Sequence, residues 1–282
     1  MWAMLSALVE RGAVLITDAP IEQHTVARIA QMIGPLQPQI YGELFDVRVT
    51  HDPINLAYST EAIGAHMDLC YYESPPGLQL LHCIQHDAHT GGGESLLIDG
   101  FAAVEQLRAE QPDAFAALSR IPATFIKDHS KRKQPVLMSY QRPHISLDAT
   151  GALIGLFWSP PFEGPLRVPV DDIPPYYRAY RQLQRTIDSA PQWTHRLAPG
   201  EVLVFNNRRM LHGRTAIHAP SEQSAARWLQ GCYINIDEFM NRYNKLRREF
   251  GQEELARAHS IGNQDWALPQ YLCVLPPDCT RR

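Results

Sequence analysis

The chain lacks the features that mark secreted, membrane-bound or disulfide-rich proteins. Its 282 residues include only five cysteines, an odd number without a Cys-x-x-Cys pair, which predicts reduced thiols rather than a disulfide framework or a redox motif. No apolar run approaches the length of a membrane span, and the first twenty residues lack the basic-then-apolar order of a signal peptide. We therefore expect a cytoplasmic protein that does not bind membranes.

Clustered positive charge is also missing. The net charge is −4, and the basic segment 245–248 is short enough to be the solvated face of a late helix. Nucleic acid is excluded as a partner on this ground, because neutralising phosphates requires clustered lysine and arginine. With 45% hydrophobic and 20% charged residues, the chain can bury the core of one enzyme-sized domain. We assign residues 1–250 to that domain and residues 251–282 to an irregular tail.

Short strand-like segments dominate the middle of the chain and are separated by Gly, Pro and Asp turns. The predicted strands are 13–17, 78–83, 95–98, 123–126, 144–147, 153–157, 201–205 and 229–236. Helical spacing occurs at 4–11, 21–33, 102–119 with a break near Pro112, and 176–189. This pattern predicts a mainly β fold with flanking helices, a double-stranded β-helix or jelly roll.

Two histidines and one carboxylate are the strongest chemical signal in the sequence. His66 and Asp68 are two positions apart, so in a strand both side chains would point the same way, and His212 would reach the same metal from a distant strand. This ligand set fills one face of an octahedral Fe(II) ion and leaves the other face open for oxygen chemistry. Arg227 offers a bidentate fork for a carboxylate about one strand later.

A second metal site is the alternative use of the cysteines. Cys70, His82, Cys83 and His86 carry zinc-ligand chemistry, but their spacing is irregular and neighbouring strand positions point to opposite faces. We therefore interpret the cysteines as small buried hydrophobic residues.

Five motifs in a fixed order give the chain a family resemblance. They are AHMDLCYY (65–72), SPPGLQLLHC (74–83), GGGESLLIDGF (91–101), NNRRMLHGR (206–214) and RWLQGCY (227–233). In this order and spacing they resemble the gamma-butyrobetaine dioxygenase branch of the Fe(II)/2-oxoglutarate dioxygenases, which contains trimethyllysine dioxygenase and is related to taurine dioxygenase. The resemblance covers roughly residues 5–250. Full-length family members carry a small zinc-binding domain before this region, and we expect this chain to lack it.

The resemblance implies Fe(II), 2-oxoglutarate and O2 as cofactor and cosubstrates. It identifies His66, Asp68 and His212 as metal ligands and Arg227 as the partner of the remote carboxylate of 2-oxoglutarate. Ser95 offers that carboxylate a hydroxyl donor or is satisfied locally, and Leu81 would form an apolar wall beside it.

For the substrate, the resemblance implies an aromatic cage around a quaternary ammonium, because ring faces attract a cation that has no N–H to donate. The matching positions are Tyr41, Phe45, Tyr58 and Tyr233, with Phe45 where the family has Trp. Asn55 matches one of two asparagines that position the substrate carboxylate. The segment of the second, 156–166, contains none and has Trp158 instead, so a phosphonate, another betaine or a natural-product amine stays open as substrate.

The expected reaction is hydroxylation of a small molecule, with desaturation and rearrangement left open. Asp68 argues against halogenation, since related halogenases replace this carboxylate to make room for chloride. A zinc hydrolase with the same ligands and a non-catalytic binding module are alternatives of other classes, although neither needs Arg227 together with a cation cage. A homodimer is left open.

Overall fold

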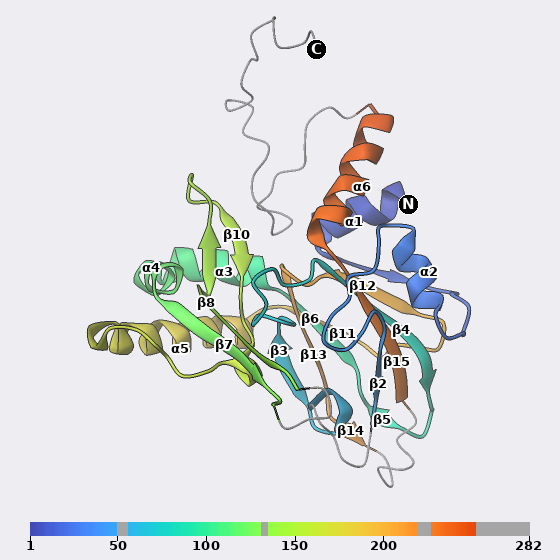
Figure 1. The fold of residues 1–282 in the computed structure, drawn as a ribbon, viewed down its shortest axis with the longest axis horizontal. Coiled ribbons are helices and arrows are strands. Elements are labelled where there is room, and N and C mark those ends of the chain that lie inside the picture. Colours follow the sequence, from blue (N-terminus) through green and yellow to red (C-terminus); the bar gives the residue numbers. More distant parts are fainter. Residues whose placement is uncertain (50–55, 131–134, 219–226, 252–282) are drawn as a thin grey trace, which may run out of the picture.

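Two antiparallel sheets form the centre of the computed structural model, which describes residues 1–49, 56–130, 135–218 and 227–251 (Figure 1). The larger sheet has the strand order β1-β12-β4-β15-β2, and the smaller has β11-β6-β13-β3. The larger contains β1 (Ala13–Ile16), β12 (Val202–Asn206), β4 (Leu78–His86), β15 (Arg227–Ile234) and β2 (Phe45–Arg48). The smaller contains β11 (Gln192–His195), β6 (Ser95–Asp99), β13 (Met210–Arg214) and β3 (Ile63–His66). The predicted mainly β fold with flanking helices is confirmed.

Strand β4 lies at the middle of the larger sheet and is covered on both faces. Leu78 and Leu80 pack into a cluster on the helical side, whereas Leu81 belongs to a different cluster on the opposite side. Strands that are covered on both faces have continuous apolar runs in their sequence, which explains why the sequence predicts β4. Gln79 and Leu81 are thereby turned towards the space between the sheets, where the pocket lies.

Three helices cover the outer face of the larger sheet: α1 (Trp2–Arg11), α2 (Thr25–Gln31) and α6 (Ile236–Glu249). Helix α2 is shorter than predicted because His24 adopts a positive φ of 68°, which ends any helix before Thr25. Strand β15 ends two residues before its predicted end because the Asn235 side chain accepts a hydrogen bond from Asp237 N and caps α6.

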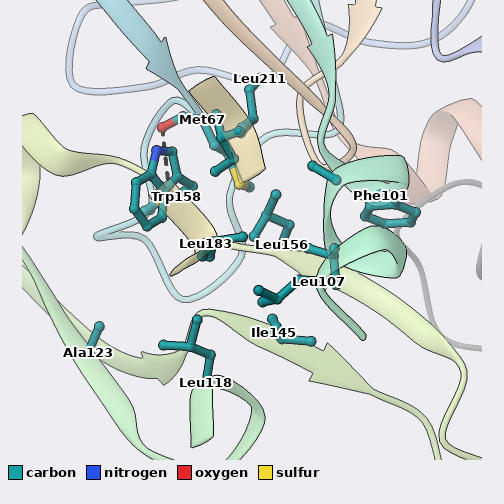
Figure 2. Packing of buried hydrophobic residues seen from close by; sticks show 14 of the residues in the cluster. Met67, Phe101, Leu107, Leu118, Ala123, Ile145, Leu156, Trp158, Leu183 and Leu211 are labelled. Carbon is teal, nitrogen blue, oxygen red and sulfur yellow. Dashed lines mark hydrogen bonds between the residues drawn. The ribbon is translucent and has the colours of Figure 1, made fainter. Parts of the chain in front are cut away.

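A second layer of core lies beside the smaller sheet. It consists of helices α3 (Gly100–Glu110), α4 (Pro112–Arg120) and α5 (Ile173–Ser189) with the hairpins β7 (Pro122–Asp128)–β8 (Leu137–Pro143) and β9 (Ile145–Leu147)–β10 (Leu153–Leu156). Pro112 starts α4, as the predicted break requires. Figure 2 shows Met67 and Trp158 meeting in this core, where Met67 N donates to Trp158 O over 2.6 Å. The backbone at Met67, between His66 and Asp68, is thus held by a hydrogen bond to the core.

Several strands were not predicted because they carry no apolar alternation. Strands β8 and β11 are mostly exposed and polar, so their pairing is visible only in the tertiary structure. The short pair β5 (Gly91–Gly92) and β14 (Ile217–His218) has too few residues for a pattern. The remaining short elements are the 3-10 turns η1 (Leu56–Tyr58), η2 (Pro160–Phe162) and η3 (Val170–Asp172).

Cys70, Cys83 and Cys232 are free and buried, and burial raises the pKa of the Cys83 thiol to about 11 and that of Cys232 to about 12, so these thiols are unreactive. Within the described part of the chain, no helix combines the length and apolar character needed to cross a bilayer. The predicted tail lies outside the described residues apart from Gly251.

Candidate metal centre and pocket

His66, Asp68 and His212 converge as the sequence predicted. His66 Nε2 lies 3.3 Å from Asp68 Oδ1, and His212 Nε2 lies 3.6 Å from Asp68 Oδ2. Their ligand atoms all lie within 4.8 Å of one another, and no other group of metal-ligand type gathers among the described residues. The two histidines are direct cross-strand partners on β3 and β13, with ring centroids 4.3 Å apart. Antiparallel pairing therefore brings the distant ligands together.

Glycine between His212 and Arg214 allows this pairing. A Cβ at Gly213 would lie 2.5 Å from the carbonyl oxygen of Ile63 on β3. Any side chain there would push β13 away from β3 and separate the two histidines.

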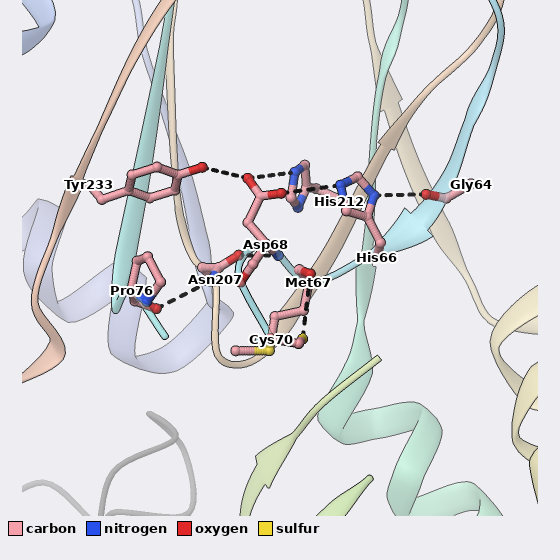
Figure 3. A network of polar contacts seen from close by, with 9 residues as sticks. All are labelled: Gly64, His66, Met67, Asp68, Cys70, Pro76, Asn207, His212 and Tyr233. Carbon is pink, nitrogen blue, oxygen red and sulfur yellow. Dashed lines mark hydrogen bonds and ion pairs between the residues drawn. The ribbon is translucent and has the colours of Figure 1, made fainter. Parts of the chain in front are cut away.

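Asp68 reaches the metal site from a turn, which corrects the predicted strand geometry. Strand β3 ends at His66, and Leu69 follows Asp68 with a φ of 61°, an uncommon conformation for a residue with a branched side chain. The turn is held by Asn207, whose Oδ1 accepts from Asp68 N over 3.0 Å and whose Nδ2 donates to Asp68 O over 3.2 Å (Figure 3). The same Nδ2 also contacts Pro76 O at 3.2 Å.

Hydrogen bonds orient the ligand side chains (Figure 3). His66 Nδ1 lies 2.9 Å from Gly64 O, so this nitrogen carries the proton and leaves Nε2 free to bind a metal. The Tyr233 hydroxyl donates to Asp68 Oδ2 over 2.7 Å. Nδ1 of His212 is buried and has no partner among the described residues.

The electrostatics of the cluster suit a divalent cation. Burial acts to raise the pKa of Asp68, but His212, His66 and the Tyr233 hydroxyl outweigh it and hold the pKa far below its usual value. Burial, together with the neighbouring His66, lowers the pKa of His212 to about 3, so this ring is neutral at neutral pH. Although burial opposes it, the Asp68 carboxylate raises the pKa of His66. A bound cation would replace the His66 proton as the partner of Asp68.

The donor set fits Fe(II). Two imidazole nitrogens and one carboxylate oxygen on one side of a buried site form the facial arrangement that non-haem iron oxygenases use. The ligand side chains also line a pocket between the two sheets, so an ion held here would present its remaining positions to that pocket.

Most of the predicted site residues line this pocket. Around the metal ligands it collects the predicted cage residues Tyr41, Phe45, Tyr58 and Tyr233 and the predicted cosubstrate residues Leu81, Ser95 and Arg227. Phe45 and Tyr233 stack with ring centroids 5.0 Å apart. Asn55 lies outside the described residues.

Trp158 does not occupy the predicted place on the pocket wall. Its side chain is completely buried in the core, where it packs 4.6 Å from Tyr180 and 5.5 Å from His144 between ring centroids. The chain turns after Trp158, so that Pro161 and Phe162 line the pocket instead. The structure therefore places the Trp158 side chain in the core, away from the pocket where substrate contact was predicted.

Four chemically informative pocket residues were missed by the sequence analysis: Tyr71, Gln79, Phe162 and Arg214. Tyr71 lies in the same motif as the metal ligands and packs edge-on against Phe162 at 5.4 Å. Arg214 follows His212 by two positions, and strand periodicity alone could have placed it on the same face.

The arginine end of the pocket is buried and positively charged. Arg227 is 5% exposed, and burial followed by the charge of Arg214 lowers its pKa to about 10. Both guanidinium groups therefore stay protonated at neutral pH. Ser95 lies directly across from Arg214 in the pairing of β6 with β13, so a hydroxyl and two cations meet at this end.

Comparison with known proteins agrees with this geometry. Residues 2–233 match the family described as taurine catabolism dioxygenase TauD, TfdA family. The chain belongs to the TauD/TfdA family. The family and the His-Asp-His cluster confirm Fe(II) and 2-oxoglutarate as the expected cofactors.

Among curated relatives, gamma-butyrobetaine dioxygenase of Pseudomonas sp. (strain AK-1) is 34% identical over 86% of this chain and 62% of that protein. Dioxygenase str8 of Strobilurus tenacellus is 31% identical over 84% of this chain and 57% of that protein. The chain thus spans about three fifths of the length of these relatives.

A solved structure shows the same fold. Asparagine oxygenase in complex with Fe(II), 3-hydroxyasparagine and succinate superimposes with a TM-score of 0.63 at 18% identity, covering 83% of this chain and 79% of that one. The predicted jelly-roll class is thereby confirmed.

Proposed function

We propose that this TauD/TfdA chain is an Fe(II)- and 2-oxoglutarate-dependent oxygenase that hydroxylates a small quaternary-ammonium compound. The observation that carries the proposal is one buried pocket with three kinds of wall: the His-Asp-His cluster, an arginine end and an aromatic end. Each kind matches one participant in the reaction, namely the metal, an anionic cosubstrate and a cationic substrate.

His66, Asp68 and His212 would hold the iron through Nε2, a carboxylate oxygen and Nε2. Bound iron would supply activation of O2, coupled to oxidation of 2-oxoglutarate to succinate and CO2. The chain itself would keep the three ligands in their binding states: Gly64 O fixes the His66 tautomer, and burial keeps His212 neutral.

Arg227 would bind the remote carboxylate of 2-oxoglutarate. Its guanidinium is buried, protonated and part of the pocket wall, and its Nε has no partner among the described residues. A desolvated guanidinium pairs with a carboxylate through two parallel hydrogen bonds. Ser95, 5% exposed on the same wall, would add a hydroxyl donor, and Leu81 would exclude water from this end.

The aromatic end would hold the substrate cation. Tyr41, Phe45 and Tyr233 line it, and the unpredicted Tyr71 and Phe162 add two further rings. An ammonium that carries only methyl groups gains nothing from hydrogen-bond acceptors but is attracted to ring faces. The name of the Pseudomonas relative, gamma-butyrobetaine dioxygenase, supports this substrate class.

A gamma-butyrobetaine-like compound differs from another small amine or a phosphonate in the group that it carries at the end opposite the cation. Gln79 also lines the pocket, and its Oε1 is buried without a partner among the described residues. An unpaired amide oxygen accepts hydrogen bonds, so it favours a substrate that carries a hydroxyl or N–H donor.

Anaerobic reconstitution with Fe(II) and 2-oxoglutarate, followed by oxygen and a panel of betaines, tests the proposal. We expect succinate and a product heavier by one oxygen atom from a quaternary ammonium, and much less from the isosteric neutral carbon analogue. Cation–ring attraction contributes roughly 0.5 to 2 kcal/mol.

His66→Ala and His212→Ala are the controls and should lose both Fe(II) binding and succinate formation. Activity with Zn(II) in place of Fe(II) would indicate a hydrolase instead. Equal turnover of charged and neutral analogues would remove the betaine assignment while leaving the oxygenase intact.

A further inference from the structure

Arg214 is a second buried cation in the pocket and has no assigned role. It lies on β13 two residues after His212, is 4% exposed and lines the pocket together with Ser95 and Arg227. Like other arginines in proteins, it is charged at neutral pH. Among the described residues, no carboxylate forms an ion pair with it.

The hydrogen bonds of Arg214 use only one side of its guanidinium. Nη2 donates to the carbonyl oxygens of Ser59 and Glu61, at 3.0 and 2.5 Å. Nε and Nη1 are buried and have no partner among the described residues. Buried donors on a charged group are costly when unpaired, so this side of the group is built for an acceptor that carries negative charge.

Arg227 repeats this feature from the opposite sheet. Its Nε is also buried without a partner among the described residues, and the charge of Arg214 contributes to the lowering of its pKa. Glu94, the acidic residue that partly offsets the charge on Arg227, has its carboxylate engaged by the Thr215 hydroxyl. A carboxylate between two guanidinium groups would relieve their repulsion and satisfy donors on both.

The bonded side of Arg214 leads to the segment that contains Tyr58. Ser59 directly follows η1 and Glu61 comes two residues later. Tyr58, the last residue of η1, lines the pocket. A carboxylate on Nε and Nη1 fixes the plane of the guanidinium. Because the group is rigid, it also fixes Nη2 and the two carbonyls that Nη2 holds.

We propose that Arg214 is a second arginine for the remote carboxylate of 2-oxoglutarate, and that through Ser59 and Glu61 it transmits occupancy of this subsite to the Tyr58 segment. The proposal rests on the function proposed above, since it takes 2-oxoglutarate as the anion.

The first measurement is the affinity for 2-oxoglutarate of the Fe(II)-loaded protein without oxygen, followed by the charge-transfer absorption of the complex. Arg214→Gln should weaken binding roughly 10- to 100-fold, as loss of a charged hydrogen-bond partner does. Arg214→Lys, which keeps the charge but not the fork, should recover part of it. Fe(II) affinity should stay within a few-fold of wild type, which shows that each variant is folded.

Arg142 provides a matched control. It is also a partly buried arginine whose Nη2 donates to two backbone carbonyls, Tyr72 O at 2.6 Å and Glu73 O at 2.7 Å, but it does not line the pocket. Arg142→Gln should leave 2-oxoglutarate affinity unchanged. Equal loss in both variants would reduce Arg214 to a structural role and overturn the proposal.

The second measurement is amide hydrogen exchange in residues 56–62 with and without 2-oxoglutarate, which needs no substrate. Exchange should slow on binding in wild type and remain unchanged in Arg214→Gln at saturating 2-oxoglutarate. Slowing in the variant as well would disprove the transmission. If wild type does not bind 2-oxoglutarate at all, the proposed function fails; if Arg214→Gln binds as tightly as wild type, only this inference fails.

Discussion

The hydroxyl of Tyr233 donates a hydrogen bond to Asp68 Oδ2 over 2.7 Å while the ring of the same side chain stacks on Phe45. One residue on β15 therefore touches both the metal centre and the aromatic end of the pocket. Its two roles are separable, because the hydroxyl can be removed while the ring stays.

Tyr233→Phe should weaken metal binding by roughly 10-fold, the usual effect of losing a hydrogen bond to a metal-ligating side chain. Cation binding should change little, since the ring face remains. Titration with Co(II), read by its absorption, measures the first effect. Tyr243→Phe, which removes the hydroxyl of a buried tyrosine outside the pocket, is the control. Unchanged Co(II) affinity in Tyr233→Phe would mean that Asp68 is held by its backbone alone.

Asn207→Ala should damage the Asp68 turn. It leaves Asp68 N, the partly buried Asp68 O and the buried Pro76 O without their side-chain partner, at a cost of about 1 to 3 kcal/mol in the free energy of unfolding. Chemical denaturation with and without Co(II) separates fold from site. We expect the metal to stabilise the variant less than wild type, and equal stabilisation would show that the turn forms without Asn207.

Arg227→Met should raise the 2-oxoglutarate concentration needed for half-saturation far more than the Fe(II) concentration. Loss of a desolvated, charge-assisted pair costs on the order of 2 to 5 kcal/mol. Independent titrations of the two ligands provide the comparison. An unchanged 2-oxoglutarate dependence would place the carboxylate elsewhere in the pocket.

Phe45→Trp should strengthen binding of a quaternary ammonium, because the indole face is the better partner for a cation. The Phe45 ring lies against Gly231, where a Cβ would come within 2.4 Å of it, so the larger ring has to extend towards the pocket. Calorimetric titration with a betaine and its neutral analogue measures the gain. A lower melting temperature with no gain in affinity would identify Phe45 as a packing residue.

His144 makes the metal-free protein less stable in acid. Burial lowers its pKa from 6.5 to about 4, and its ring nitrogens contact Phe157 O and the Tyr176 hydroxyl. In the unfolded chain His144 is protonated below about pH 6.5, whereas in the folded chain it stays neutral down to about pH 4. The free energy of unfolding therefore falls as the pH falls through this window.

Between pH 7.5 and 5 this group alone should remove about 2 kcal/mol. Urea unfolding of the chelator-treated protein at the two pH values should show a correspondingly smaller loss in His144→Gln, whose side chain does not titrate. Identical pH dependence in both proteins would exclude a neutral buried His144.

By itself, the sequence predicted the His-Asp-His cluster and named Arg227 and most of the aromatic residues that line the pocket. These residues could be named because their side-chain chemistry and the order of the motifs are both visible in the sequence. The buried strands of the larger sheet were equally clear, since their apolar runs report burial directly, as in β4. Edge strands such as β11 gave no signal because their side chains are polar and exposed.

Only the tertiary structure decided how these residues meet. The pairing of His66 with His212 depends on the register of β3 and β13, and the approach of Asp68 depends on a turn held by Asn207. Trp158 entered the core rather than the pocket because the chain bends after it, which composition does not reveal. Contacts between residues far apart in sequence are set by packing and strand register, and a local sequence pattern does not predict them.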